Sequence, residues 1–147
     1  MKLLNYTTKI KVDKTFSEIP TILAEMGANA VMTEYNDDRV MSAISFRFTG
    51  KFGLTMYRLP ANIDKIYKEI QDRKYKNLTQ ANRSSEQAAR IAWRIIKDWV
   101  EAQASLIYAE QVDLEQVFLP YMQSDTGKTV YEMINEQGGY TNVLRLK

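Results

Sequence analysis

The chain of 147 residues contains neither cysteine nor histidine. Without cysteine there is no disulfide and no thiolate-bound zinc. Without histidine, Ser-His-Asp and Cys-His nucleophiles and the His-Glu-x-x-His zinc motif are excluded. Carboxylates, hydroxyls, Lys, Arg and Tyr remain, so an oxygen-ligated hard-metal site stays open. We therefore predict that the protein is not an enzyme, has no catalytic, cofactor-binding or metal-binding residues, and folds without metal or reductant.

Long apolar runs are also missing. No run approaches the roughly 18 residues that cross a bilayer, and residues 1–6 lack the apolar region of a secretory signal. We expect a cytoplasmic protein without membrane contact. With 45% hydrophobic and 26% charged residues, the composition is that of a globular chain. We expect one domain over residues 1–137, with a sheet part over 1–60 and a helical part over 61–137, and a flexible tail over 138–147.

The order of periodic patterns predicts the fold class. Alternation over residues 7–12 predicts a strand, and helical spacing follows over 16–26. Three more alternating stretches between residues 29 and 59 predict strands. Helices are expected from Asn62 and from Ser84, with shorter helical segments near residues 112–122 and 130–136. Strands grouped before helices favour an α+β fold: a strand, a helix and a three-stranded antiparallel meander, followed by a helical C-terminal half.

The meander also predicts a buried face. Phe46 lies on one face of the expected middle strand, and a tight turn is expected at Gly50-Lys51. We expect Leu54 and Met56 to share the buried face with Phe46, and Tyr57 to lie on the opposite face.

Two short motifs invite a functional interpretation but have simpler ones. Thr126-Gly127-Lys128-Thr129 resembles the end of a nucleotide-binding P-loop, but the earlier glycine and the preceding strand are absent. We expect a helix cap at Asp125 or Thr126 instead. The paired carboxylates Asp37 and Asp38 lie beside Asn36 between two expected strands, and a hairpin turn explains them better than a metal site.

Charge is unevenly distributed along the chain. Residues 65–100 contain nine Lys and Arg against four Asp and Glu, a net charge of +5, whereas residues 101–136 contain one against seven, a net charge of −6. Such asymmetry marks a binding surface, or two segments that pack together and neutralise each other. Both interpretations remain open.

A basic stripe on the long helix is the main candidate contact surface. Spacings of seven, four and three residues place Arg83, Arg90, Arg94 and Lys97 on one stripe, with Trp93 beside it and a basic loop before it. Cations and aromatic rings suit phosphate contact and base stacking. The alternative is a solvated face with the i,i+4 pairs Glu86–Arg90 and Arg94–Asp98. The candidate contact residues are Arg73, Lys74, Lys76, Arg83, Arg90, Trp93, Arg94 and Lys97.

The stripe leads to a prediction about charge reversal. We expect the double variant Arg90→Glu, Arg94→Glu to weaken nucleic-acid binding and to leave the fold intact. Trp93 and Trp99 cannot share one narrow helix face, so one of them is expected in the core. Arg94, Trp99 and Tyr121 are candidate anchors of a protein interface.

The sequence of the long helix, residues 85–103, together with residues 117–122, 127–132 and Arg58-Leu59-Pro60, resembles a family of small uncharacterised proteins of phages, prophages and other bacterial mobile elements. The resemblance implies a biological setting and assigns no site residues.

From these observations we predict a non-enzymatic binding protein of a phage or mobile element. Its expected partner is a nucleic acid or a host nucleic-acid-processing or defence complex. One alternative is a protein that sequesters a nucleotide signal in a pocket at a subunit interface. Another is a carboxylate-dependent metal nuclease. Charge segregation and the second Trp also predict a homodimer, the commonest symmetric assembly.

Overall fold

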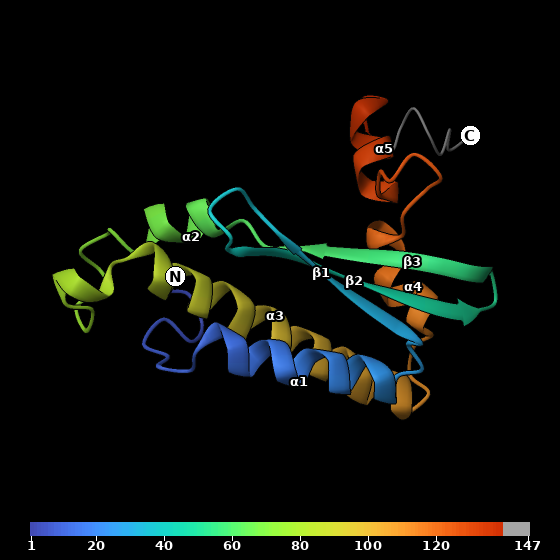
Figure 1. Ribbon diagram of the computed structural model, residues 1–147, viewed down its shortest axis with the longest axis horizontal. Helices are drawn as coiled ribbons and strands as arrows, with labels where there is room; N and C mark the ends of the chain where they lie inside the picture. The colour runs from blue at the N-terminus through green and yellow to red at the C-terminus, as the bar shows by residue number, and fades with distance from the viewer. Residues whose placement is uncertain (140–147) are drawn as a thin grey trace.

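The elements follow the expected order from the first helix onward. The computed structural model describes residues 1–139. Its elements are α1 (Val12–Glu25), β1 (Ala30–Tyr35), β2 (Met41–Gly50), β3 (Gly53–Pro60), α2 (Ile63–Glu69), η1 (Gln80–Asn82), α3 (Ser85–Tyr108), α4 (Leu114–Phe118), η2 (Leu119–Tyr121) and α5 (Val130–Glu136) (Figure 1). The α+β class and the antiparallel meander β1-β2-β3 are confirmed.

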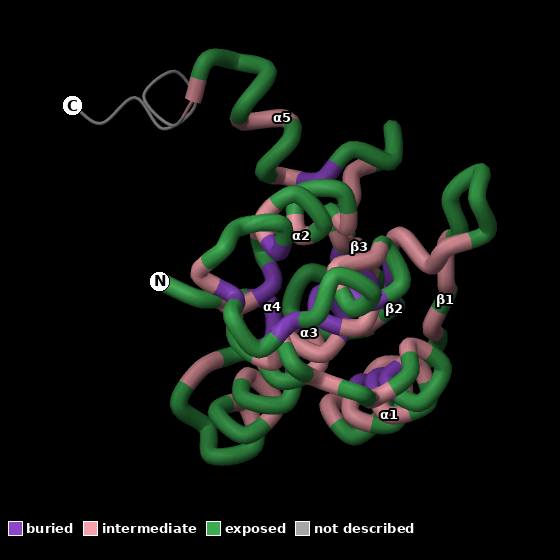
Figure 2. The backbone as a smooth tube through the Cα atoms, turned by 90° about the vertical axis from the view of Figure 1, so that its left-hand side faces the viewer, coloured by how far each residue is buried: buried purple, intermediate pink, exposed green. Residues whose placement is uncertain are grey.

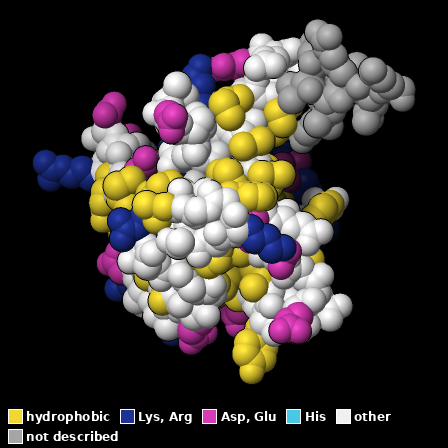
Figure 3. Space-filling model, turned by 90° about the vertical axis from the view of Figure 1, so that its right-hand side faces the viewer, with side chains coloured by type: hydrophobic (Ala, Val, Ile, Leu, Met, Phe, Trp, Pro, Cys, Tyr) yellow, Lys and Arg dark blue, Asp and Glu magenta, His cyan; other side chains and the backbone are white. Residues whose placement is uncertain are grey.

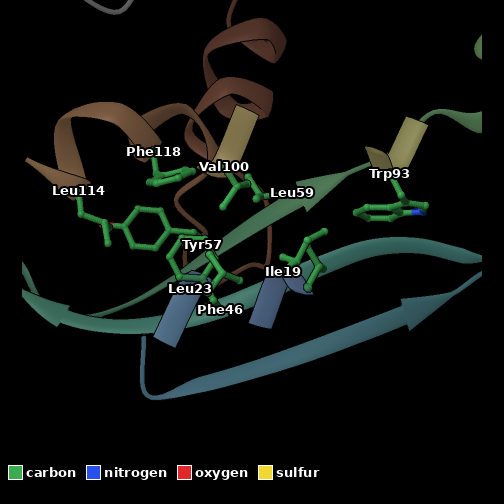
Figure 4. Close-up of a cluster of buried hydrophobic side chains, with 10 residues drawn as sticks. Ile19, Leu23, Phe46, Tyr57, Leu59, Trp93, Val100, Leu114 and Phe118 are labelled. Atoms are coloured by element: carbon green, nitrogen blue, oxygen red, sulfur yellow. The ribbon is translucent and has the colours of Figure 1, made fainter. Parts of the chain in front are cut away.

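The main core lies between one face of the sheet and the helices α1, α3 and α4 (Figures 1 and 4). Ile19 from α1, Phe46 from β2 and Val100 from α3 are fully buried there. Phe118 from α4 packs edge-on against Phe46 and Trp99, at centroid distances of 5.3 and 5.4 Å. The helical half of the chain therefore covers the face of the sheet that α1 also covers.

The predicted facing of β3 was wrong by one residue. Tyr57 pairs with Phe46 across the ladder and is fully buried, with the two rings stacked 5.1 Å apart. Leu54 lies on the opposite face and is 65% exposed, and Met56 shares that face. The β2–β3 loop contains two residues, because Gly50 pairs with Gly53. A two-residue loop pairs an even-numbered residue with an odd-numbered one, which places Tyr57 beside Phe46.

The strand expected over residues 7–12 does not form. Residues 8–11 have no ladder partner, and α1 begins at Val12 and contains Pro20, earlier than the expected start at residue 16. The carbonyls of Tyr6 and Thr8 instead accept hydrogen bonds from the Gln87 side-chain amide, at 3.1 and 2.9 Å. At the start of α3, the Ser84 side chain accepts from the Gln87 backbone amide, while the Gln87 side chain donates to these two carbonyls.

A second, smaller cluster holds the N-terminal segment against α2 and α3. Tyr75 is its buried centre and packs edge-on against Tyr6 at 5.1 Å. The Tyr75 hydroxyl donates to Glu69 at 2.8 Å and accepts from the Leu3 amide at 3.1 Å. Burial raises the pKa of this phenol, with the bond to Glu69 adding to the shift. The loop over residues 71–82 is therefore anchored by this smaller hydrophobic cluster, in which Tyr75 and Leu78 are buried.

The C-terminal helices are attached to the outer edge of β3. The Gln123 amide donates to the Met56 carbonyl at 2.8 Å, next to a bridge between Tyr57 and Met122. The expected cap at Asp125 or Thr126 was wrong, since α5 is capped by Thr129 in a capping box with Glu132. The tail expected over 138–147 lies almost wholly outside the described residues. No helix within residues 1–139 is both long and apolar enough to cross a membrane.

Candidate nucleic-acid interface

Two of the predicted contact residues join α3 to α1. Arg94 Nη1 lies 3.0 Å from Glu18 Oε2, and Lys97 Nζ lies 3.7 Å from the same oxygen and also contacts Glu101. Only 15% of the Arg94 side chain and 13% of the Lys97 side chain are exposed. The hydrogen bond to Glu101 raises the pKa of Lys97. Both cations are therefore already neutralised by carboxylates inside the fold.

The other two stripe residues also have partners within the chain. Arg90 pairs with Glu86 at 2.7 Å, which confirms one expected i,i+4 pair. The other expected pair is replaced by Arg94–Glu18. The Arg83 guanidinium donates to the backbone carbonyls of Ile70, Asp72 and Tyr75 at 2.5, 2.9 and 2.9 Å. It thereby ties the loop over residues 71–82 to the start of α3.

Trp93 does not belong to a contact surface, and its inclusion there was wrong. Its side chain is fully buried, packs edge-on against Phe16 at 4.5 Å and donates from Nε1 to the Met41 carbonyl at 3.0 Å. Trp99 is the half-buried one of the pair, as the spacing required. It packs against Tyr121, and with Pro60 and Ile95 these rings line a small apolar hollow of about 280 Å³.

The loop residues differ from the stripe. Lys74 pairs with Glu69, which raises the pKa of the lysine and lowers that of the carboxyl group. Arg73 and Lys76 are exposed, and neither forms an ion pair within residues 1–139. They are the two predicted contact residues whose charges face solvent unpaired.

The structure also exposes cations that were not among the candidates. Lys65 and Lys68 lie on the outer side of α2, opposite Ile63 and Ile66, which pack into the smaller cluster. Helical spacing in α2 was sufficient to place these lysines outward. Further exposed cations are Lys2, Lys9, Lys11 and Lys14 at the N-terminal side of α1. Their proximity to the loop could not be predicted, because it depends on tertiary contacts such as that of Leu3 with Tyr75.

Together these elements form what we call the basic end: residues 1–14 and 63–90, at the start of α3 (Figure 1). It contains eleven Lys and Arg against five Asp and Glu, a net charge of +6. Figure 2 looks onto this end, where most of the backbone belongs to exposed residues. Exposed Lys and Arg side chains of this kind can contact phosphates through their tips.

The far end of α3 has the opposite charge. The 24 residues of α3 extend about 36 Å at 1.5 Å per residue, and beyond them lie α4 and α5. Residues 101–136, which we call the acidic end, contain one Lys against seven Asp and Glu; Figure 3 views this side of the molecule. The segregation along the sequence therefore becomes a separation in space. Within the described part of the chain, no three carboxylates lie close enough together to hold a metal ion.

Comparisons of the chain with protein-family models, with curated proteins and with solved structures find no match.

Proposed function

We propose that this protein is a non-enzymatic binding protein whose basic end contacts the phosphate backbone of a nucleic acid, in the phage or mobile-element setting that the sequence resemblance implies. The observation that carries the proposal is the set of exposed cations at the basic end that have no carboxylate partner within residues 1–139: Lys2, Lys9, Lys11, Lys14, Lys65, Lys68, Arg73 and Lys76.

Unpaired cations favour a polyanion for a thermodynamic reason. A cation already paired inside the protein must break that pair before it contacts a phosphate, whereas an exposed one need only lose water. Each phosphate contact also releases condensed counterions from the nucleic acid. For duplex DNA, the logarithm of the binding constant therefore falls by about 0.9 per contact for each tenfold rise in salt concentration.

The same end has little with which to read bases. This end contains three aromatic side chains, Tyr6, Tyr67 and Tyr75. Tyr75 is buried and Tyr6 is half-buried, whereas Tyr67 on α2 is 39% exposed. Contacts made by long cationic side chains position a protein on the backbone without specifying sequence. We therefore expect binding that tolerates sequence changes, with the acidic end turned away from the strand.

The test compares two double variants of equal net charge. Lys65→Glu, Lys68→Glu reverses two cations at the basic end, and Lys51→Glu, Lys128→Glu reverses two exposed cations elsewhere. Fluorescence anisotropy with a 20-base-pair duplex and a 20-nucleotide single strand, from 50 to 200 mM salt, measures the affinity. We expect the wild type and the Lys51/Lys128 variant to bind alike, and the Lys65/Lys68 variant to bind at least tenfold more weakly, with its salt slope lower by about two units.

Two results would contradict the proposal. Equal weakening by both variants would mean that net charge alone matters, and no binding by the wild type at 50 mM salt would exclude the polyanion. Melting curves show whether each variant is folded.

A further inference from the structure

A groove of about 700 Å³ lies between the C-terminal halves of α1 and α3. The two helices run in the same direction, since Phe16 contacts Trp93 and Glu18 contacts Lys97 further along (Figure 1). The groove is lined from Ser17 to Met26 on α1 and from Lys97 to Tyr108 on α3. At 1.5 Å per residue this is a trough of about 14 to 17 Å, or three helical turns.

The floor of the groove is apolar. Ile22, Met26 and Ile107 line it and are only partly buried, although each packs against the main core below. Tyr108 stands at one end of the trough and is 92% exposed. Apolar side chains in a concave site gain free energy when a partner covers them, by about 25 cal/mol per Å².

The surroundings of the groove are negative for two independent reasons. Three carboxylates line it, and one of them, Glu25, forms no ion pair within residues 1–139. In addition, α1 and α3 both end beside the groove, and neither has a basic residue in its last turn. The macrodipole of a helix favours a cation at its C-terminus. Neither last turn supplies one, and the lysine that lines the groove, Lys97, lies further back and pairs with Glu101.

We propose that this groove binds an amphipathic helix of a partner protein, about three turns long, with an apolar stripe flanked by Lys or Arg. The stripe would cover Ile22, Met26 and Ile107, and the cations would lie near Glu25 and the two helix ends. A helix resting in the trough between two parallel helices buries its apolar side and keeps its cations at the rim. The inference uses no property of the basic end and is independent of the proposed function.

The test uses a fluorescein-labelled twelve-residue peptide with Leu on one helical stripe and Lys on both flanks. Two control peptides accompany it: one with every Lys replaced by Glu, and one with two central residues replaced by Pro, which prevents a helix. The variants are Ala104→Phe, which fills the groove, and Glu25→Lys, which reverses the unpaired carboxylate. Matched controls are Ala102→Phe, on an exposed part of α3 outside the groove lining, and Asp125→Lys, in an exposed loop.

We expect the wild type and both control variants to bind the Lys peptide equally, and Ala104→Phe and Glu25→Lys to bind it at least tenfold more weakly. The Glu peptide should not bind, and the Pro peptide should bind at least tenfold more weakly than the Lys peptide. No binding of the Lys peptide, or equal binding by Ala104→Phe and Ala102→Phe, would overturn the proposal. Equal binding of the Pro peptide would show that an extended basic segment, and not a helix, occupies the groove.

Discussion

The cations on α3 and those on α2 and the following loop differ in what surrounds them. Arg90, Arg94 and Lys97 each face a carboxylate, and their side chains are only 13 to 24% exposed. Lys65 and Lys76 are exposed, and within residues 1–139 neither has an ionic partner. The sequence made the first group look like a binding stripe because of its spacing. Whether a cation on a helix is free to bind a partner therefore depends on what packs against that helix. The spacing of residues in the sequence does not reveal this.

The difference has a structural cause. Because α1 lies along α3, Glu18 forms ion pairs with Arg94 and Lys97 of the α3 stripe. Nothing in the described part of the chain packs on the outer side of α2, so its lysines stay free. The cations of α3 therefore stabilise the fold, and those of α2 and the loop remain available to a partner.

The largest effect on stability is expected at Arg83. Arg83→Ala removes three hydrogen bonds from a charged donor to the carbonyls of Ile70, Asp72 and Tyr75. Bonds to charged groups are worth about 1.5 to 3 kcal/mol each and are not additive, so we expect a loss of about 3 kcal/mol in urea unfolding. Arg73→Ala, in the same loop but exposed, should cost within about 0.5 kcal/mol. Equal losses of unfolding free energy in Arg83→Ala and Arg73→Ala would contradict the distinction between cations that stabilise the fold and cations that are free for a partner.

A smaller loss is expected from charge reversal at Arg94. Arg94→Glu would place two carboxylates side by side at the α1–α3 contact, in side chains that are 15 and 27% exposed. We expect a cost of about 2 kcal/mol, contrary to the earlier expectation that the double variant Arg90→Glu, Arg94→Glu leaves the fold intact. The swapped variant Glu18→Arg, Arg94→Glu should recover a large part of it. Failure of the swap to recover stability would show that the pair is not the cause.

The smallest expected effect on stability comes from ionisation of the buried Tyr75 hydroxyl at high pH. Burial raises the pKa of the Tyr75 hydroxyl, so folding favours its neutral form. That contribution is complete below the ordinary tyrosine pKa of about 10 and is lost as the pH rises through the folded value. Between pH 9.5 and 11.5 the melting temperature should therefore fall less steeply in Tyr75→Phe than in the wild type. If the melting temperature falls equally steeply in both proteins, the loss of stability at high pH comes from another group, for example Tyr57, whose pKa is also raised by burial.

Much of the fold follows from local patterns. The helices α2 and α3 were expected from periodicity and from the caps Asn62 and Ser84, because caps and helical spacing act within a few residues. The helix α5 was expected as well, but its cap is Thr129 and not Asp125 or Thr126. The facing of β3 was predicted wrongly because any two-residue turn pairs even-numbered with odd-numbered residues, so Leu54 and Met56 cannot share a face with Phe46. The strand predicted over residues 7–12 was also wrong: this segment has no ladder partner, and the side chain of the distant Gln87 binds the carbonyls of Tyr6 and Thr8.

The candidate site was predictable only in part. The basic character of residues 65–100 was visible in the sequence, and the candidates included Arg73 and Lys76, which the structure leaves exposed and without an ion pair within residues 1–139. That Arg94 faces Glu18 could not be predicted, because the two lie 76 positions apart and meet only when α1 packs on α3. The same limit hid the position of the N-terminal segment, which reaches the loop through the contacts of Leu3 and Tyr6 with Tyr75.

Titration of ¹⁵N-labelled protein with a short DNA duplex, followed through the backbone amide shifts, locates the nucleic-acid interface. We expect shifts to concentrate in residues 1–14 and 63–82, and the amides of residues 114–136 to stay unchanged. Shifts concentrated in α4 and α5, or no shift at 50 mM salt and millimolar duplex, would contradict the assignment of the basic end as the nucleic-acid interface.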